Sequence, residues 1–167
     1  MNATDTALLI LRLWLAVVML AHGINHGRNL EGTASWFESK GFRQPLLNAR
    51  MSAAGELAIG LGIATGLLTA FAAAGLIATM TVAFGSIHRF AGFFVFKRPD
   101  EGYEYVATLA VAALALAVIG PGSASLDSAF GIDMLNGWTG LIIALAGVAA
   151  GAVQLAVFWR RPAPPAA

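Results

Sequence analysis

Long apolar segments separated by short polar ones dominate the hydropathy pattern of the chain. Apolar positions run with few interruptions through residues 7–25, 51–87, 103–119 and 135–159. A helix needs about 20 predominantly apolar residues to cross a bilayer, within a range of about 17–25. The tract at 51–87 is too long for one crossing, so we divide it at Gly66–Thr69 into two helices joined by a tight turn. The pattern therefore predicts five membrane-spanning helices.

Composition agrees with a lipid environment. Of the 167 residues, 58% are hydrophobic and 11% are charged, against about 45–50% and about 25% in soluble domains. All six prolines lie outside the predicted helices, where a missing amide donor breaks no hydrogen bond. A net charge of +1 excludes a protein that binds nucleic acid by neutralising phosphates. The absence of cysteine excludes disulfides and thiolate metal sites.

The basic residues are confined to one side of the predicted topology. Apart from Arg12, they are Arg28, Lys40, Arg43 and Arg50 in the first loop, Arg89, Lys97 and Arg98 in the third, and Arg160 and Arg161 in the tail. Cytoplasmic loops collect Lys and Arg near the ends of membrane spans. We therefore expect the amino terminus outside the cell and the carboxyl terminus in the cytoplasm.

The first loop, residues 27–50, is long enough to contain a short helix of its own. Trp36 and Phe37 lie beside charged residues, and Gly41 favours a helix end. We expect this helix to lie in the membrane interface, with Trp36 and Phe37 as anchors at head-group depth. A surface for docking a partner is the alternative.

Ionisable side chains within apolar segments are the main functional signal, because each costs about 2.5–3.5 kcal/mol at mid-membrane and requires a partner or a role. The predicted topology places most of them at one depth near the cytoplasm. We predict an inner-leaflet polar cluster of His22, Asn25, His26, Glu56, His88 and Glu104, with Tyr103 and Tyr105 at its edge.

Three roles remain open for this cluster. His22 and His26 are four residues apart and share one helix face, so with Glu56 they would form a two-histidine, one-carboxylate site for iron or zinc. The cluster would otherwise be a hydrogen-bonding pocket for a quinone or lipid head group, or a structural polar clasp. We expect no intrinsic cofactor, since the sequence has neither cysteine nor a nucleotide-binding motif.

Arg12 belongs to the opposite half of the bilayer. It precedes His22 by ten residues, which is about 15 Å along a helix. A buried guanidinium needs a partner, and a carboxylate satisfies it with two parallel hydrogen bonds. We predict an ion pair between Arg12 and Asp127 that closes the outer end of the bundle. Asp133, Asp5 and snorkelling to the interface are the alternatives.

Glycines spaced four residues apart occur in two of the predicted helices, at Gly62 and Gly66 and at Gly147 and Gly151. This spacing lets helices approach closely. We expect the first pair to pack inside its own hairpin. The segment at 135–159 contains no charged residue, so we expect it to face lipid or another subunit, including a second copy of the chain.

Several short motifs occur in a characteristic order: Arg12, His22-Gly23, Trp36–Phe42, Ala54-Gly55-Glu56-Leu57, Gly120-Pro121-Gly122 and Ser125-Leu126-Asp127. This order resembles the DoxX family of small bacterial membrane proteins over residues 11–127. The family often has a lysine a few residues after the His-Gly pair. His26 stands near that place here, so a role of that lysine does not carry over.

The resemblance implies an all-α membrane protein of the bacterial plasma membrane. We expect a four-helix DoxX-like bundle over residues 1–133, an additional membrane-spanning helix over 134–159, and a disordered cytoplasmic tail over 160–167. The fifth helix exceeds the family's usual unit, and we infer that it was added for a partner or for topology.

The resemblance also implies a function. The family includes subunits of thiosulfate-oxidising and terminal-oxidase systems, and partners in oxidoreductase complexes for oxidative-stress defence. We expect an accessory subunit of an inner-membrane redox complex, whose polar pocket binds quinone or lipid and whose partners are membrane lipids and other membrane subunits. The alternative is a noncatalytic scaffold or assembly subunit of a transport complex, such as a lipid importer. An independent enzyme is not expected, because no self-sufficient catalytic motif is present.

Overall fold

The computed structural model describes residues 1–96 and 101–162, and within these ranges the chain is helical and has no strand. The longer helices are α1 (Ala3–Arg28), α2 (Leu30–Ser39), α3 (Pro45–Thr65), α4 (Thr69–Ala83), α6 (Glu104–Ile119) and α8 (Gly137–Phe158). The shorter ones are the π-helix η1 (Phe84–His88), α5 (Arg89–Ala91), α7 (Leu126–Phe130) and the 3-10 helix η2 (Asp133–Leu135). The predicted all-α class is therefore confirmed. Lys97, Arg98 and the tail from residue 163 lie outside the described residues. The predicted disorder from residue 160 is wrong for the first tail residues, because the amide of Arg160 donates to the carbonyl of Gly41 at 2.9 Å.

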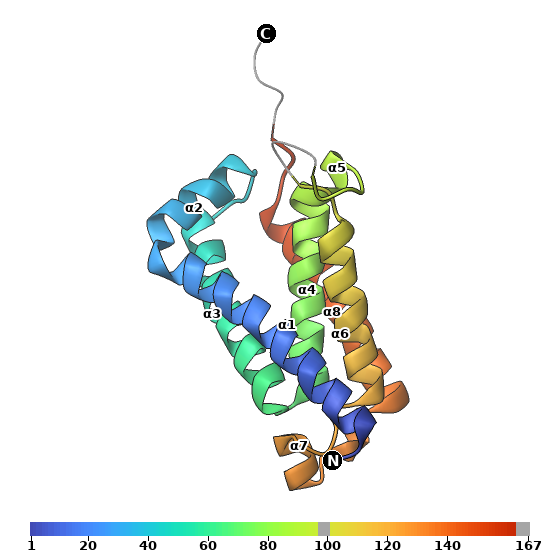
Figure 1. Ribbon diagram of the computed structural model, residues 1–167. Helices are drawn as coiled ribbons and strands as arrows, with labels where there is room; N and C mark the ends of the chain where they lie inside the picture. The colour runs from blue at the N-terminus through green and yellow to red at the C-terminus, as the bar shows by residue number, and fades with distance from the viewer. Residues whose placement is uncertain (97–100, 163–167) are drawn as a thin grey trace.

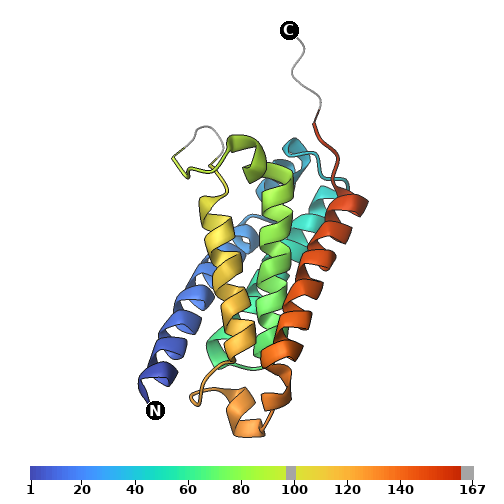
Figure 2. The ribbon, with the colours of Figure 1, turned by 90° about the vertical axis from the view of Figure 1, so that its right-hand side faces the viewer.

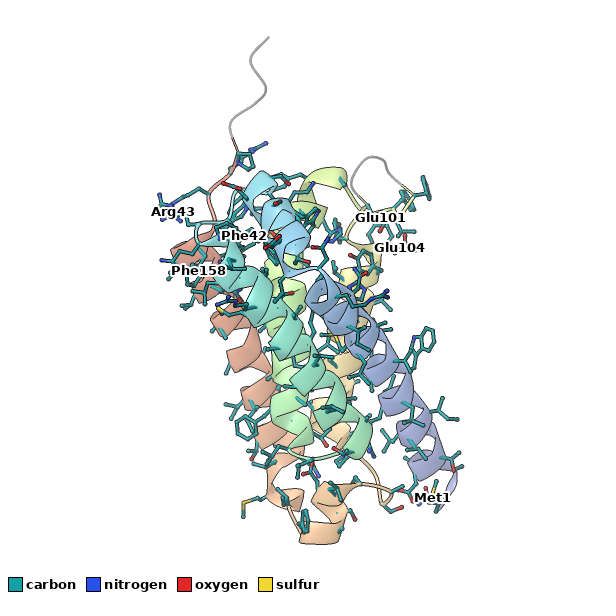
Figure 3. All side chains as sticks on the ribbon, turned by 90° about the vertical axis from the view of Figure 1, so that its left-hand side faces the viewer. Met1, Phe42, Arg43, Glu101, Glu104 and Phe158 are labelled. Atoms are coloured by element: carbon teal, nitrogen blue, oxygen red, sulfur yellow. The ribbon has the colours of Figure 1, made fainter. Side chains whose placement is uncertain are left out.

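The long helices form an elongated bundle with two distinct ends (Figure 1 and Figure 2). The amino terminus, α7 and the α3–α4 turn lie at one end, and α2 and α5 lie at the other. Figure 3 places Phe42 and Phe158 side by side at the α2 end, far from Met1. There the amide of Arg43 donates to the carbonyl of Phe158 at 2.6 Å, which joins the start of α3 to the end of α8.

Three helical stretches are long and apolar enough to cross a membrane: Ala3–Arg28, Thr69–Ala91 and Gly137–Phe158. The helix at Glu104–Ile119 is apolar but shorter. The predicted break in the tract at 51–87 is present, because Gly66 and Leu68 adopt left-handed φ values of 65° and 47°. All five predicted segments are thus helical, whereas the crossings by α3 and α6 stay predictions.

The glycine face of α8 packs against α4. A side chain at Gly147 would collide with the backbone oxygen of Ala74, and one at Gly151 would lie 2.6 Å from that of Ala78. This face of α8 therefore packs within the chain, whereas contact of its exposed face with lipid or another subunit stays a prediction. The pair at Gly62 and Gly66 belongs to the α3–α4 hairpin as predicted, with Gly62 packed closely against α4.

Arg12 joins three segments at the end of the bundle that holds the amino terminus. Its side chain is 1% exposed. Its Nε donates to the carbonyl of Ile63 at 2.9 Å, and its Nη2 donates to that of Ala64 at 2.7 Å. Its Nη1 donates to the carbonyls of Pro121 at 2.9 Å and Ala124 at 2.8 Å. One side chain of α1 thereby holds the last turn of α3 and the loop between α6 and α7.

The predicted hydrogen-bonded ion pair between Arg12 and Asp127 is wrong, because Arg12 bonds to carbonyls, although Asp127 lies near enough to act on its charge through space. Asp127 instead accepts the amides of Leu68 at 2.7 Å and Thr69 at 2.8 Å. Helix ends explain this partition, since the last carbonyls of α3 lack intrahelical donors and the first amides of α4 lack acceptors. A guanidinium therefore suits the carbonyl end of α3, and a carboxylate suits the amide end of α4. Asp5 accepts the amide of Ser123 at 2.8 Å, so it does not replace Asp127 as the partner.

We expect Arg12→Leu to destabilise the protein strongly. The change removes the guanidinium from four buried or partly buried carbonyls, of which that of Ile63 keeps only the Gly66 amide at 3.3 Å, and hydrogen bonds to charged groups contribute about 1.5–3 kcal/mol each. A loss of about 3 kcal/mol or more in the free energy of unfolding should appear as a large fall in Tm in detergent. Arg50→Leu, at an exposed arginine of α3, is the control. Equal Tm values for the two variants would contradict this role of Arg12.

Candidate functional site

A cavity of about 520 Å³ opens in the half of the bundle nearer α2. Small-molecule sites span about 300–1,000 Å³ and combine apolar walls with a few placed polar groups, and this cavity has both. Its apolar wall includes Met19, Trp36, Met80 and Leu109. Its polar groups are His22, Asn25, His26, Ser52, Glu56, Thr79, Ser86, His88, Glu101, Tyr105 and Gln154.

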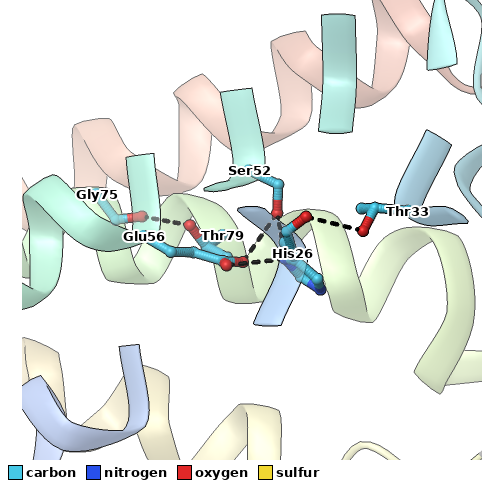
Figure 4. A network of polar contacts seen from close by, with 6 residues as sticks. All are labelled: His26, Thr33, Ser52, Glu56, Gly75 and Thr79. Carbon is cyan, nitrogen blue, oxygen red and sulfur yellow. Dashed lines mark hydrogen bonds and ion pairs between the residues drawn. The ribbon is translucent and has the colours of Figure 1, made fainter. Parts of the chain in front are cut away.

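A first cluster of polar side chains in the cavity wall, formed by His26, Ser52 and Glu56, joins α1 to α3 (Figure 4). Nδ1 of His26 lies 2.9 Å from Oε2 of Glu56 and 3.0 Å from Oγ of Ser52. The Ser52 hydroxyl donates to Oε1 of Glu56 at 2.9 Å. Because the Ser52 hydroxyl proton points at Glu56, the short contact between His26 Nδ1 and Glu56 Oε2 needs a proton of its own, which lies between these two atoms. Nε2 of His26 has no hydrogen-bond partner within the described parts of the chain.

A second cluster, formed by His88 and Tyr105, joins η1 to α6. Nδ1 of His88 lies 2.6 Å from the backbone oxygen of Glu101, and Nε2 lies 2.8 Å from the hydroxyl of Tyr105. A carbonyl oxygen only accepts, so Nδ1 carries the proton. In the neutral ring Nε2 is then an acceptor, and the Tyr105 hydroxyl donates to it. Hence Tyr105 presents its oxygen lone pairs to any further donor.

The π-helix η1 places His88 in this wall. Gly85, Ser86, Ile87 and His88 are all buried, although successive residues of a helix point in different directions. They are buried because different elements surround the segment: a side chain at Gly85 would meet Leu155 of α8, while His88 reaches Tyr105 of α6. Single π turns occur often at functional sites.

The structure brings most of the predicted polar cluster together. His22, Asn25, His26, Glu56 and His88 all line the cavity, and so does Tyr105, which was expected at its edge. The helical spacing of His22 and His26 on α1 accounts for their shared orientation, with their ring centroids 6.0 Å apart. Their assignment as ligand-binding residues stays a prediction.

Tyr103 and Glu104 do not belong to the cavity wall, and this part of the prediction is wrong. The Tyr103 ring packs edge-on against Phe84 at 5.3 Å and Phe93 at 5.4 Å. Glu104 accepts the amide of Val95 at 3.1 Å. Because α6 begins at Glu104, these two residues serve the loop before it, and Tyr105 is the first to face the cavity.

Phe37 is not an interfacial anchor. Its side chain is 7% exposed and packs in a cluster with Phe42, Ala49 and Val82, because α2 folds back onto the start of α3. Trp36, in contrast, is 42% exposed. For Trp36 the anchoring role stays a prediction, although the residue also borders the cavity.

His22, His26 and Glu56 do not form the metal site that their types and spacing allowed. Among the described residues, no group of three His, Cys, Asp or Glu side chains is arranged to hold a metal ion. The reason lies in α3: Glu56 and Ser52 both engage Nδ1 of His26, while His22 takes no part in that contact.

Sequence reasoning missed several polar residues of the site. Ser52 stands four residues before Glu56, on the same face of α3, and that spacing is a signal that was available. Gln154 donates to Oδ1 of Asn48 at 3.2 Å and so links α8 to α3. Ser86 and Thr79 donate to backbone carbonyls of their own segments, a local pattern with no functional signal in the sequence.

We expect His88 to be in the Nδ1–H tautomer when it is neutral. The chain has three histidines, so ¹⁵N NMR of histidine-labelled protein in detergent resolves them, with His22→Gln and His26→Gln for assignment. Tyr105→Phe removes the donor to Nε2 and should shift the Nε2 resonance while leaving Nδ1 protonated. A neutral His88 protonated at Nε2, or no response to Tyr105→Phe, would contradict the geometry.

Comparison with known proteins agrees with the composition and the helices. Residues 7–89 match the family model DoxX, a region that includes Arg12, His26, Glu56 and His88. No curated protein matches the chain, and neither does any solved structure. The family match, together with helices long and apolar enough to span a bilayer, identifies the chain as a membrane protein that belongs to the DoxX family.

Proposed function

We propose that this protein is an accessory subunit of an inner-membrane redox complex and that the cavity lined by His26 and Tyr105 binds a quinone head group. The observation that carries the proposal is the pairing of a mostly apolar cavity with two hydrogen-bonded histidine groups on different helices. The cavity volume of about 520 Å³ is within the usual range for a small cyclic ligand.

A quinone ring has apolar faces and carbonyl oxygens that accept hydrogen bonds, whereas the reduced quinol has hydroxyls that donate. The free Nε2 of His26 suits both forms. It accepts from a quinol when the ring is neutral, and it donates to a quinone when the ring is protonated. Glu56, 4% exposed and 2.9 Å from Nδ1, holds the ring in place so that Nε2 stays available to the ligand.

The second histidine group complements the first. The Tyr105 hydroxyl donates to His88 and keeps lone pairs for a quinol donor. Met19, Met80 and Leu109 supply apolar surface for the faces of the ring. The chain contains no cysteine, so an iron–sulfur centre held by thiolates would belong to a partner subunit. Our proposal therefore gives this chain the binding site and assigns electron delivery to a partner.

We further propose five crossings of the bacterial plasma membrane with the α2 end in the cytoplasm. Seven described basic residues support this orientation. They lie in the helix ends and connecting segments at the α2 end: Arg28, Lys40, Arg43, Arg50, Arg89, Arg160 and Arg161. No Lys or Arg occurs in the loops that would then face outward. In this orientation α2 lies at the inner interface and the cavity lies in the inner leaflet.

Tryptophan fluorescence tests quinone binding directly. Trp36 borders the cavity, so a variant that keeps only this tryptophan (Trp14→Phe, Trp138→Phe, Trp159→Phe) should show saturable quenching by a short-chain ubiquinone or menaquinone analogue. His26→Gln in that background should weaken binding by up to about tenfold, because one hydrogen bond contributes about 0.5–1.5 kcal/mol and about 1.4 kcal/mol is a factor of ten in Kd.

The matched control keeps only Trp138, which is 81% exposed and does not line the cavity. It reports the quinone that merely dissolves in the micelle, so its quenching should rise without saturation. Identical curves for the Trp36 and Trp138 reporters would overturn the proposed site.

Purification from native membranes in mild detergent tests the assignment to a redox complex. We expect oxidoreductase subunits to co-migrate with the protein. Glu56→Gln should leave that association intact while lowering quinone-dependent activity of the complex at least tenfold, because the carboxylate that accepts from Ser52 and orients the His26 ring is lost. Transport ATPase subunits in place of oxidoreductases would favour the scaffold alternative and overturn our proposal.

A further inference from the structure

A second, smaller cavity lies at the α2 end of the bundle and has a different chemical character. Its volume is about 210 Å³. It is bordered by the end of α2, by η1 and α5, and by the segment that follows α8. Lys40 and Arg161 line it together with the ring of Phe90 and the two serines Ser39 and Ser86. Two cationic residues from segments far apart in the sequence thus meet at one small cavity.

Arginine side chains are concentrated on one aromatic ring beside this cavity. The guanidinium carbon of Arg161 lies 4.8 Å from the centroid of Phe90, and that of Arg89 lies 4.6 Å from the same centroid. Phe90 in turn stacks on Trp159 at 6.3 Å. Within residues 1–96 and 101–162, no ion pair joins Arg89 or Arg161 to a carboxylate. Because like charges repel, an anion bound beside them would lower the electrostatic energy.

The surroundings place this cationic cavity at the level of lipid head groups. Trp159 ends the apolar helix α8, and the loop after α5 carries Phe93, Phe94 and Phe96 with exposed fractions of 49%, 51% and 71%. Exposed aromatic rings of this kind are enriched at membrane–water interfaces. Phospholipid phosphates are the abundant anions at that depth.

We propose that the second cavity binds the phosphate of an anionic phospholipid head group. Lys40 and Arg161 supply positive charge at the cavity wall. Arg89, which also packs on the Phe90 ring, adds to the positive potential there. Basic pockets between membrane helices bind anionic head groups by this chemistry. The site needs only the cationic end of the bundle to lie at an interface, so it does not depend on quinone binding in the larger cavity.

Native mass spectrometry and thermal unfolding of the purified protein in neutral detergent test the site. We expect phosphatidylglycerol to bind and to raise Tm, whereas phosphatidylcholine and inorganic phosphate at equal concentration should not. The double variant Lys40→Gln/Arg161→Gln should weaken phosphatidylglycerol binding about tenfold. Because Trp36 quenching by quinone reports the other cavity, it should be unchanged in this variant.

The control is Arg50→Gln, which removes an exposed cation of α3 that does not line the cavity. It should bind phosphatidylglycerol like the unmodified chain. Equal weakening by the control and the double variant would show bulk attraction to basic side chains and overturn the proposal. A Tm shift with inorganic phosphate equal to that with phosphatidylglycerol would also overturn it, because the ligand would then be the free anion.

Discussion

The buried guanidinium of Arg12 is the contact on which the arrangement of the helices depends. It binds four backbone carbonyls, two at the end of α3 and two in the loop that follows α6. Carbonyls at a helix end or in a loop have few backbone donors, and away from water an unsatisfied carbonyl carries a desolvation cost. A single cation in α1 therefore stabilises helix ends that apolar packing alone would leave unsatisfied. Asp127 completes the same region by accepting the first amides of α4.

The consequences of this contact extend to the opposite end of the bundle through close packing of α1 on α3. Gly23 approaches the backbone of Leu57, and Gly60 approaches the side chain of Leu20. With α1 held at one end by Arg12 and along its length by these glycines, His26 meets Glu56 in a defined register. The Arg12 contacts and the α1 wall of the cavity thus belong to one packed helix pair.

Some of this arrangement was accessible from the sequence. Apolar length predicted the helical segments, Gly66–Thr69 predicted the hairpin, and four-residue spacing predicted that His22 and His26 share a face. The partners of Arg12 were not accessible, because backbone carbonyls carry no residue identity. The placement of Tyr103 and Glu104 failed for another reason: both contact the loop before α6, and the path of that loop is a tertiary feature that the sequence pattern does not define. Phe37 was misplaced because the fold of α2 onto α3 is a tertiary contact.

The π-helix η1 shows most clearly what local sequence patterns leave out. Phe84–His88 contains no proline, and its apolar residues suit an ordinary helix. Different surroundings border its sides: Leu155 of α8 lies against Gly85, Tyr105 of α6 bonds to His88, and the two cavities adjoin Ser86 and Ile87. Ser86 and Ile87 line both cavities, so this one segment forms the partition between an apolar site with histidines and a cationic site at the bundle end. A regular α-helical turn would place these side chains about 100° apart in sequence, and inserting one residue into the turn changes which of them face each side. The geometry of η1 therefore determines at once where His88 lies and how the two sites are separated.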